Sequence, residues 1–195
     1  MKFKGWGAEA KLNDFLSILT SLDCHWELIE SYDSFNDAEP DIGELNEIET
    51  FVIKERAGRL YMWPPLGRVG SSLGFAMEVS VRLNTQCLFG SVDTAIDLTE
   101  FGLVNRGTII RSVKALNVFA PVFWQLGSPI GCETIVPLQS QRGEGVIEAL
   151  RRYGYDFGKE SITEGPFHVY NLDTSNLPSS TYDEEYEAML KDSME

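Results

Sequence analysis

Hydrophobic residues recur at helical spacing in three parts of the chain. Residues 8–22 place Leu12, Phe15, Leu16, Leu19 and Leu22 on one face of a helix. A second apolar stripe lies in residues 71–83. Part of that stretch, residues 76–83, also alternates as a strand does, and we favour the helix because it leads naturally into the apolar run 87–93. Residues 143–154 form the third predicted helix, which ends at a glycine suited to a C-terminal cap.

Short runs rich in β-branched and aromatic residues predict the strands. They are residues 24–31, 50–55, 59–63, 87–93, 95–104, 108–116 and 167–172. Turn residues predict hairpins at 57–58 and at 105–107, where Gly107 suits a left-handed backbone. In the second hairpin we expect Ile109 and Val113 on one face of the strand, because their spacing is even.

These elements predict an α+β fold, with a mainly antiparallel sheet and about three helices packed on it. Residues 1–175 are expected to form a single α+β domain. Residues 176–195 are expected to be an acidic C-terminal tail or a short helix.

Charge is unevenly distributed along the chain, which has 195 residues and a net charge of −14. Residues 30–49 contain eight acids and no Lys or Arg, and residues 183–195 contain six acids and one Lys. Such localisation suits a partner with a basic surface, although an acidic surface also keeps proteins soluble. Because the chain has no basic patch to displace counterions from phosphates, we expect no binding to nucleic acid.

Cysteine usage indicates a reducing compartment. Cys24, Cys87 and Cys132 are widely spaced and contain no CxxC pair, which predicts reduced thiols in a cytoplasm. The first residues are basic but precede no apolar core, and no apolar run is long enough to span a bilayer. We therefore expect a cytoplasmic protein without a signal peptide or a membrane partner. Cys24 and His25 are too few ligands for zinc, so no metal or cofactor is expected.

The loop from Gly67 to Gly74 is the best candidate for a phosphate site, because it precedes a helix whose first N–H groups attract anions. It lacks the Lys-Ser/Thr ending of a P-loop and the GxGxxG spacing of a dinucleotide site. A loop followed by Ser71 or Ser72 as the helix N-cap is therefore the favoured interpretation.

Three carboxylates, Asp93, Asp97 and Glu100, lie close together on predicted strands. Asp97 and Glu100 have opposite parity, so a regular strand would point them to opposite faces. We favour solvent-exposed strand acids, balanced by Arg111 and Lys114 on the neighbouring strand, over a catalytic pair.

Residues 99–112 read TEFGLVNRGTIIRS, which is a strand, a glycine turn and a second strand with an arginine near its end. Preceded by a helix and a strand, this hairpin resembles many small bacterial proteins. They include proteins encoded beside polymorphic or contact-delivered toxins and identified as their immunity proteins. The resemblance covers residues 71–116 and, more loosely, 143–172, and no functional residue is carried over from it.

Acidity, reduced thiols, the absence of a catalytic motif and this resemblance together favour an acidic stoichiometric binding protein rather than an enzyme. We expect an immunity or inhibitor protein that neutralises a bacterial toxin by occluding its active site. The alternatives are a small nucleotide- or phosphate-binding enzyme that uses the loop 67–74, and an adaptor subunit that docks through its acidic tail.

Partner-binding residues are expected in the acidic segment 30–49, because apolar side chains that could act as anchors lie among its acids. The candidates are Tyr32, Asp33, Phe35, Asp37, Glu39, Asp41, Glu44, Leu45 and Glu47.

Overall fold

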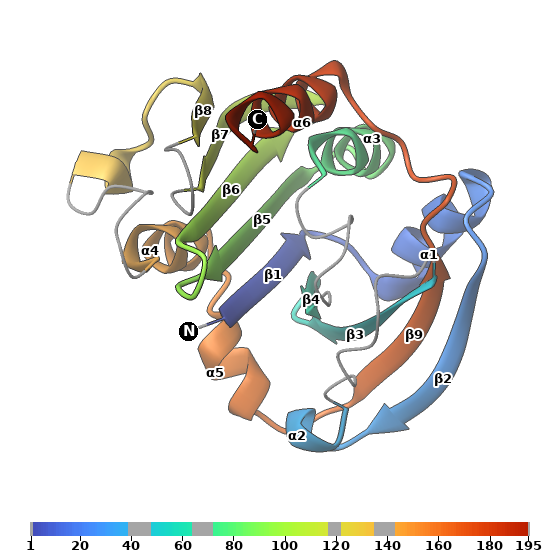
Figure 1. Ribbon diagram of the computed structural model, residues 1–195. Helices are drawn as coiled ribbons and strands as arrows, with labels where there is room; N and C mark the ends of the chain where they lie inside the picture. Colours follow the sequence, from blue (N-terminus) through green and yellow to red (C-terminus); the bar gives the residue numbers. More distant parts are fainter. Residues whose placement is uncertain (1, 39–47, 64–71, 117–121, 135–142, 195) are drawn as a thin grey trace.

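Nine strands form one sheet in the order β2-β9-β3-β4-β1-β5-β6-β7-β8, and every neighbouring pair is antiparallel. The computed structural model describes residues 2–38, 48–63, 72–116, 122–134 and 143–194 (Figure 1). The strands are β1 (Lys2–Ala8), β2 (Trp26–Tyr32), β3 (Ile48–Arg56), β4 (Arg59–Trp63), β5 (Gln86–Asp93), β6 (Leu98–Asn105), β7 (Thr108–Leu116), β8 (Val122–Gly127) and β9 (Phe167–Asp173).

Six α-helices lie in the described ranges, together with the 3-10 helix η2 (Gly131–Thr134). They are α1 (Leu12–Ser21), α2 (Phe35–Ala38), α3 (Leu73–Arg82), α4 (Glu144–Arg152), α5 (Phe157–Ile162) and α6 (Thr181–Met194). The α+β class and the mainly antiparallel sheet are thus confirmed, whereas the expected number of about three helices is too low. The missed helices α2 and α5 have four and six residues, too few to repeat an apolar face.

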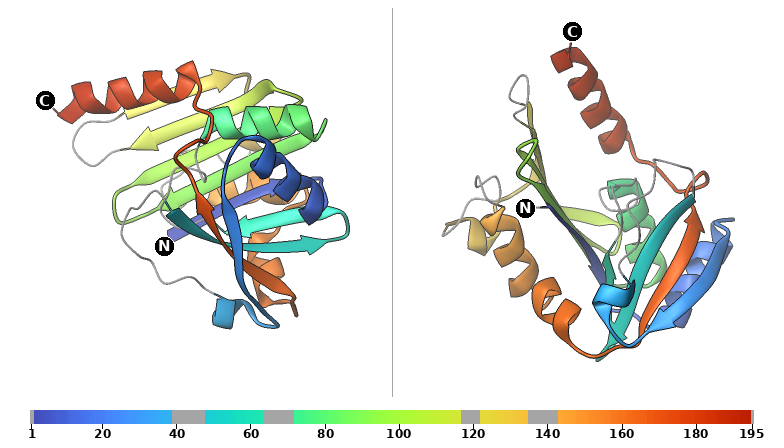
Figure 2. Two further views of the ribbon diagram at one scale, coloured as in Figure 1. Left: turned by 90° about the vertical axis from the view of Figure 1, so that its right-hand side faces the viewer. Right: turned by 60° about the horizontal axis from the view of Figure 1, so that its bottom comes forward.

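The sheet buries a hydrophobic core on each of its two faces. Trp6 and Phe89 face α1 and α3, which contribute Phe15 and Phe75 to the first core. The opposite face packs against α2, η2, α4 and α5 and forms the second core, which includes Leu88, Phe101 and Val146. The sheet is strongly curved, so that β2, β9 and β3 stand at a steep angle to β5–β8 (Figure 2).

Strand β1 lies in the middle of the sheet, although its sequence predicts no strand. Gly5 and Gly7 give it a weak strand pattern because they lack side chains that could pack. A Cβ at Gly7 would lie 2.4 Å from the ring of Tyr155, and one at Gly5 would lie 2.9 Å from Phe157. The two glycines therefore let these rings pack directly on the backbone of β1. Because Ala8 belongs to β1, the first helix begins at Leu12 and not at residue 8.

The β6–β7 hairpin is confirmed, with Gly107 at a positive φ of 78°. One detail of its expected packing is wrong. Ile109 packs against the first core and Val113 lies in the second, so the two side chains point to opposite faces. The cause is a register shift in which Leu103 pairs with Arg111 but Val104 pairs with Ile109. The extra residue on β7 reverses the alternation of side chains.

Candidate interaction surface

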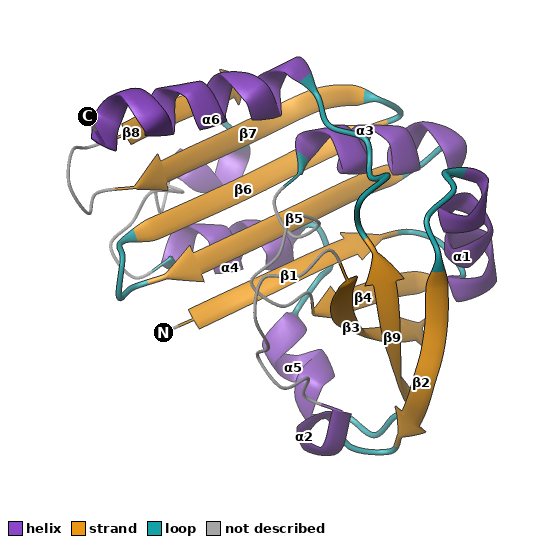
Figure 3. Ribbon diagram, turned by 45° about the vertical axis from the view of Figure 1, so that its right-hand side comes forward, coloured by secondary structure: helices purple, strands orange, loops and turns teal. Residues whose placement is uncertain are grey.

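Strand β2 is an outer strand of the sheet and pairs within the described part of the chain only with β9 (Figure 3). Its five central side chains, residues 27–31, are all exposed to solvent. They include two large apolar side chains, Leu28 and Ile29, which are 47% and 50% exposed. An edge strand also leaves a row of backbone N–H and C=O groups on its outer side. The centre of β2 therefore offers solvent both side chains and backbone.

A register shift in β2 places its two acidic side chains on the same face of the strand. Pairing with β9 is irregular between Leu28 and Glu30, so that Ile29 is an extra residue. Glu27 and Glu30 consequently stand opposite Asn171 and Val169, which point to the same face of β9. A regular strand would separate these two acids, because their spacing is odd. The irregularity instead places both carboxylates on one face of the edge.

The two ends of β2 are anchored to the rest of the protein. At one end, the Trp26 indole Nε1–H donates a hydrogen bond of 3.0 Å to Thr20 Oγ1 on α1. At the other, the half-buried Tyr32 packs against the second core, and its OH donates to Glu30 Oε2 within β2 at 2.9 Å, a hydrogen bond that raises the pKa of the Tyr32 phenol. These anchors hold the exposed central residues in a defined extended conformation.

Beside Tyr32, the Oγ of Ser31 lies 2.7 Å from His168 Nδ1 on β9, where burial lowers the pKa of the imidazole. A nucleophilic triad contains a serine and a histidine at this distance, but it also needs a third group that orients the histidine. Within the described residues, no carboxylate forms a hydrogen bond or ion pair with His168, so the third member of a triad is not present there. The Ser31–His168 pair links β2 to β9.

Of the predicted partner-binding residues, four lie in the described part of the chain. Asp33 and Asp37 are exposed just beyond the end of β2, whereas Tyr32 and Phe35 are half-buried. The Phe35 ring centroid lies 4.9 Å from that of Trp63, so this side chain belongs to the margin of the second core. The other predicted residues lie outside the described residues; they are Glu39, Asp41, Glu44, Leu45 and Glu47.

Sequence reasoning missed Glu27, Leu28 and Ile29, because the acidic segment was defined by charge alone and began at residue 30. A usable signal was present in the strand pattern of residues 24–31, which carries two acids and no Lys or Arg. Its position at the edge of the sheet depends on long-range pairing with β9, which no local pattern reveals.

The acidic C-terminal segment forms helix α6, and its first acid points inward. Tyr182 and Tyr186 pack on the ring of Trp124, while Glu184, Glu185 and Glu187 are exposed. Asp183 is half-buried and accepts hydrogen bonds from the backbone N–H groups of Leu73 (3.0 Å) and Gly74 (2.9 Å).

The N-terminus of α3, the candidate phosphate site, therefore receives a carboxylate from the same chain. Ser72 is its N-cap, as expected, with Oγ accepting a hydrogen bond of 3.1 Å from the Phe75 N–H. Residues 67–71 of the candidate loop lie outside the described residues. For the part that is described, the N–H groups of Leu73 and Gly74 that could hold an anion already have a carboxylate partner.

The expectation of solvent-exposed strand acids is wrong for Asp93 and Glu100, which are both buried. Asp97 is exposed, but it lies in the turn between β5 and β6, because β6 begins at Leu98 and not at residue 95. Glu100 stands directly opposite Lys114 on β7, as expected, and burial raises the pKa of its carboxyl. Arg111 does not balance these acids. Its guanidinium pairs with Glu133 on η2 at 2.7 Å.

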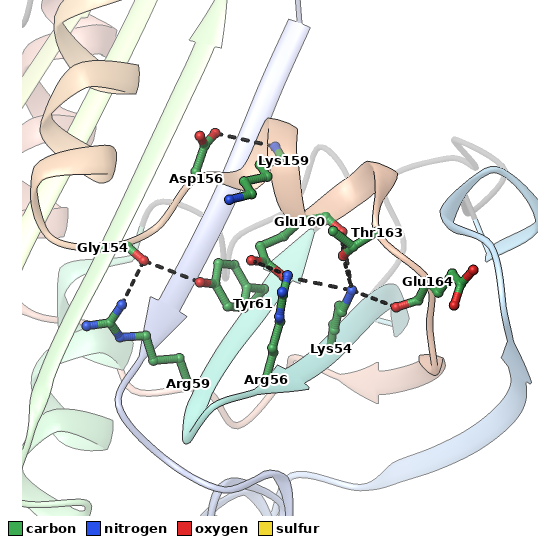
Figure 4. Close-up of polar contacts among 10 residues, drawn as sticks. All are labelled: Lys54, Arg56, Arg59, Tyr61, Gly154, Asp156, Lys159, Glu160, Thr163 and Glu164. Atoms are coloured by element: carbon green, nitrogen blue, oxygen red, sulfur yellow. Dashed lines mark hydrogen bonds and ion pairs between the residues drawn. The ribbon is translucent and has the colours of Figure 1, made fainter.

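A polar cluster that the sequence did not indicate joins β3 to the region of α5 (Figure 4). Glu160 accepts hydrogen bonds of 2.9 and 3.0 Å from Arg56, and its carboxylate lies 3.8 Å from Lys54 Nζ. The Lys54 ammonium also donates to Thr163 Oγ1 and, at 3.0 Å, to the carbonyl of Glu164. Burial lowers the pKa of Lys54, but its donors are already engaged, so the cluster fastens α5 to the sheet.

The three cysteines are unpaired and buried. Burial raises the pKa of each thiol, which makes the thiolate form less accessible. Within the described ranges, no group of three or more His, Cys, Asp or Glu residues is arranged to hold a metal ion.

Comparisons of the chain with family models, with curated proteins and with solved structures found no match. In the described part of the chain, no helix has both the length and the apolar composition needed to cross a membrane.

Proposed function

We propose that this protein is an acidic stoichiometric binding protein, an immunity protein that neutralises a bacterial toxin by covering its active site. The observation that carries the proposal is the exposed acidic edge, which we define as Glu27, Leu28, Ile29, Glu30, Asp33 and Asp37. It combines four carboxylates with two exposed aliphatic side chains and contains no Lys or Arg.

The physical role of each component follows from its exposure. Exposed carboxylates attract a cationic surface over a distance of about 10 Å and accelerate encounter. Leu28 and Ile29 can be desolvated on contact, and burial of such side chains slows dissociation. Toxins that act on nucleic acids or on phosphates present basic active-site surfaces, for which an acidic edge is a suitable cover.

The nucleotide-binding alternative has less support. The N–H groups at the start of α3 donate to Asp183, so an incoming phosphate would have to displace a carboxylate that three further hydrogen bonds hold. We place the protein in the cytoplasm, because three unpaired cysteines suit a reducing compartment.

The test first asks whether a toxin domain is encoded next to the gene of this protein, and then uses that domain in purified form. Its enzymatic activity is titrated with the protein, and we expect a linear fall that reaches complete inhibition at one equivalent. Unchanged toxin activity at a large molar excess of the protein would refute the proposal. Inhibition that needs many equivalents would contradict a one-to-one complex.

A pair of matched triple variants tests the role of the edge. Glu27→Gln/Glu30→Gln/Asp37→Asn neutralises three acids on the edge. Glu9→Gln/Asp14→Asn/Glu144→Gln neutralises three exposed acids elsewhere and changes the net charge equally.

We expect the edge variant to associate with the toxin about tenfold more slowly at low salt and with a weaker salt dependence. The control variant should stay within about twofold of the parent. Equal rates for the two variants would show that general charge, and not the edge, steers association.

A further inference from the structure

The outer side of β2 is a pairing edge with seven residues in an extended conformation. Natural edges are commonly protected by Lys or Pro or by a covering element, and Trp26–Tyr32 contains neither residue. Its protective features are the irregularity at Ile29 and the charges of Glu27 and Glu30, which do not repel a basic strand. In the described part of the chain, Trp26 and Tyr32 at the two ends of the strand pack against the two cores, whereas residues 27–31 between them are exposed.

We propose that an extended segment of the partner adds to β2 as a further strand, and that this segment alternates Lys or Arg with aliphatic residues. The proposal rests on the proposed binding function and specifies its mode of recognition. Strand addition uses backbone hydrogen bonds for affinity and alternating side chains for selectivity. The outer backbone groups of β2 supply the hydrogen bonds. The side chains of β2, acidic on one face and apolar on the other, supply the selectivity.

The side chains of β2 determine the chemistry of the added strand. Glu27 and Glu30 lie on one face of the edge, so basic side chains on that face of the added strand would stand beside them. Leu28 lies on the other face, opposite Tyr170 of β9, where an aliphatic side chain would cover it. One basic face and one aliphatic face require a segment in which the two residue types alternate.

A second copy of this chain fits the edge less well. Residues 23–38 carry five acids and no Lys or Arg, so two β2 strands side by side would bring only like charges together. Like charges on neighbouring strands are destabilising. The opposite edge strand, β8, carries no charged residue, so the strand itself offers no carboxylate to pair with a basic added strand.

Three synthetic peptides test the proposal against the intact protein. The first has the alternating sequence Thr-Lys-Val-Lys-Val-Lys-Thr, and the second rearranges the same residues as Thr-Lys-Lys-Lys-Val-Val-Thr. The third is the alternating peptide with N-methyl groups on two successive central residues, which removes a donor from each of its edges. Because net charge is the same in all three, charge alone predicts equal binding.

We expect the alternating peptide to bind about tenfold more tightly than either of the others, measured by titration of the backbone amide signals. In the complex, the backbone amides of β2 that do not pair with β9 should exchange their hydrogens at least about tenfold more slowly than in the unbound protein. Equal affinity for all three peptides, no binding of the alternating peptide, or unchanged exchange in β2 would each overturn strand addition.

A pair of lysine variants locates the site. Ile29→Lys introduces the type of residue that guards natural edges, and we expect it to weaken binding of the alternating peptide about tenfold. Val81→Lys on α3 makes the same change at a side chain of similar exposure, 55% against 50%, and should leave binding within about twofold. Equal effects of the two variants would place the peptide elsewhere.

The two proposals fail separately. If one equivalent inhibits the toxin domain while the β2 amides of that complex exchange as in the unbound protein, strand addition is wrong and the immunity function stands. If the alternating peptide protects the β2 amides while the toxin domain is not inhibited, the pairing edge is real and the immunity function is wrong.

Discussion

The carboxylate of Asp183 accepts a hydrogen bond of 2.9 Å from the backbone N–H of Gly74, across 109 positions of sequence. Its other oxygen accepts from the N–H of Leu73 at 3.0 Å, and Ser180 holds the carboxylate through its own N–H and hydroxyl. A negative charge is favourable at the N-terminus of a helix, where backbone N–H groups have no partner within the helix. The C-terminal segment thereby completes α3 and fixes the start of α6 against it.

Replacing Asp183 with Asn should destabilise the protein by about 1–2 kcal/mol, because the variant loses the negative charge and one strong acceptor at the start of α3. Urea unfolding measures the change. Glu184→Gln is the control: it removes an exposed acid from the same turn of α6 and should change the free energy of unfolding by less than about 0.5 kcal/mol. Equal effects of the two substitutions would mean that the carboxylate contributes only general charge.

The contribution of Asp183 should depend on pH. Burial alone would raise the pKa of its carboxyl, but the N–H groups of Gly74 and Leu73 and the charge of Lys114 outweigh burial and lower it. A folded-state pKa below the unfolded one gives stability that is complete above the unfolded pKa and is lost as pH falls through the folded pKa. The difference between parent and Asp183→Asn should therefore be constant from about pH 8 to about pH 5 and shrink below about pH 4. A difference that stays constant down to acid unfolding would contradict this account.

Gly74 has no room for even a methyl group, so its replacement with alanine should lower the stability of the protein. In most helices Gly→Ala stabilises by about 1 kcal/mol. Here a Cβ would lie 2.4 Å from the carbonyl carbon of Ser179 and 2.7 Å from the Pro178 carbonyl oxygen, so Gly74→Ala should destabilise and loosen the C-terminal segment.

Gly158→Ala in α5 is the matched control, since its Cβ would meet only Asp156, at 3.7 Å, and the substitution should be neutral or stabilising. Urea unfolding gives the sign of both effects, and limited proteolysis reports release of α6. A stabilising Gly74→Ala would show that the C-terminal segment yields to the added methyl group.

Two turn glycines separate backbone strain from steric contact. Gly58 and Gly107 have similar positive φ values, 74° and 78°, so valine is strained at both by about 1–3 kcal/mol. A Cβ at Gly58 meets nothing within 4 Å, whereas one at Gly107 would lie 2.5 Å from Val81 Cγ2. Gly107→Val should therefore destabilise the protein more than Gly58→Val, as measured by urea unfolding. Equal costs would assign the whole effect to the backbone.

The parts of the fold that the sequence predicted are those with a local cause. The helix α3 has both an apolar stripe and a serine N-cap, and the β6–β7 hairpin has a glycine at a positive φ. Strand β1 has no such local cause. Its glycines, Gly5 and Gly7, are needed because the rings of Phe157 and Tyr155, distant in sequence, pack on the backbone there.

The same distinction applies to the candidate surface. Charge counting identified the acidic segment. The position of β2 at the edge and the irregularity at Ile29, however, arise from pairing with β9. In that pairing Ser31 and His168 are separated by 137 positions of sequence. The carboxylate of Asp183 could not be assigned from sequence either, since nothing local distinguishes it from the exposed acids of α6. Long-range contacts therefore decide which acids are available to a partner.

Glu100 should show a pH dependence opposite to that of Asp183. It lies beside Ser91 and Lys114 in one row across β5, β6 and β7. Burial raises the pKa of its carboxyl, and the charges of Lys114 and Lys4 offset this only in part. Because the folded-state pKa exceeds the unfolded one, the folded protein binds the proton more tightly, and stability falls as pH rises from the unfolded pKa to the folded one.

Glu100→Gln keeps the shape of the side chain and removes its titration. The free energy of unfolding of the variant, relative to the parent, should therefore increase as pH rises from about 4 to about 8, and urea unfolding across this range measures it. Below about pH 4 the parent carboxyl is protonated in both states, so the difference should there become independent of pH. A variant that instead loses stability relative to the parent as pH rises would show that pairing with Lys114 outweighs the cost of burying the charge.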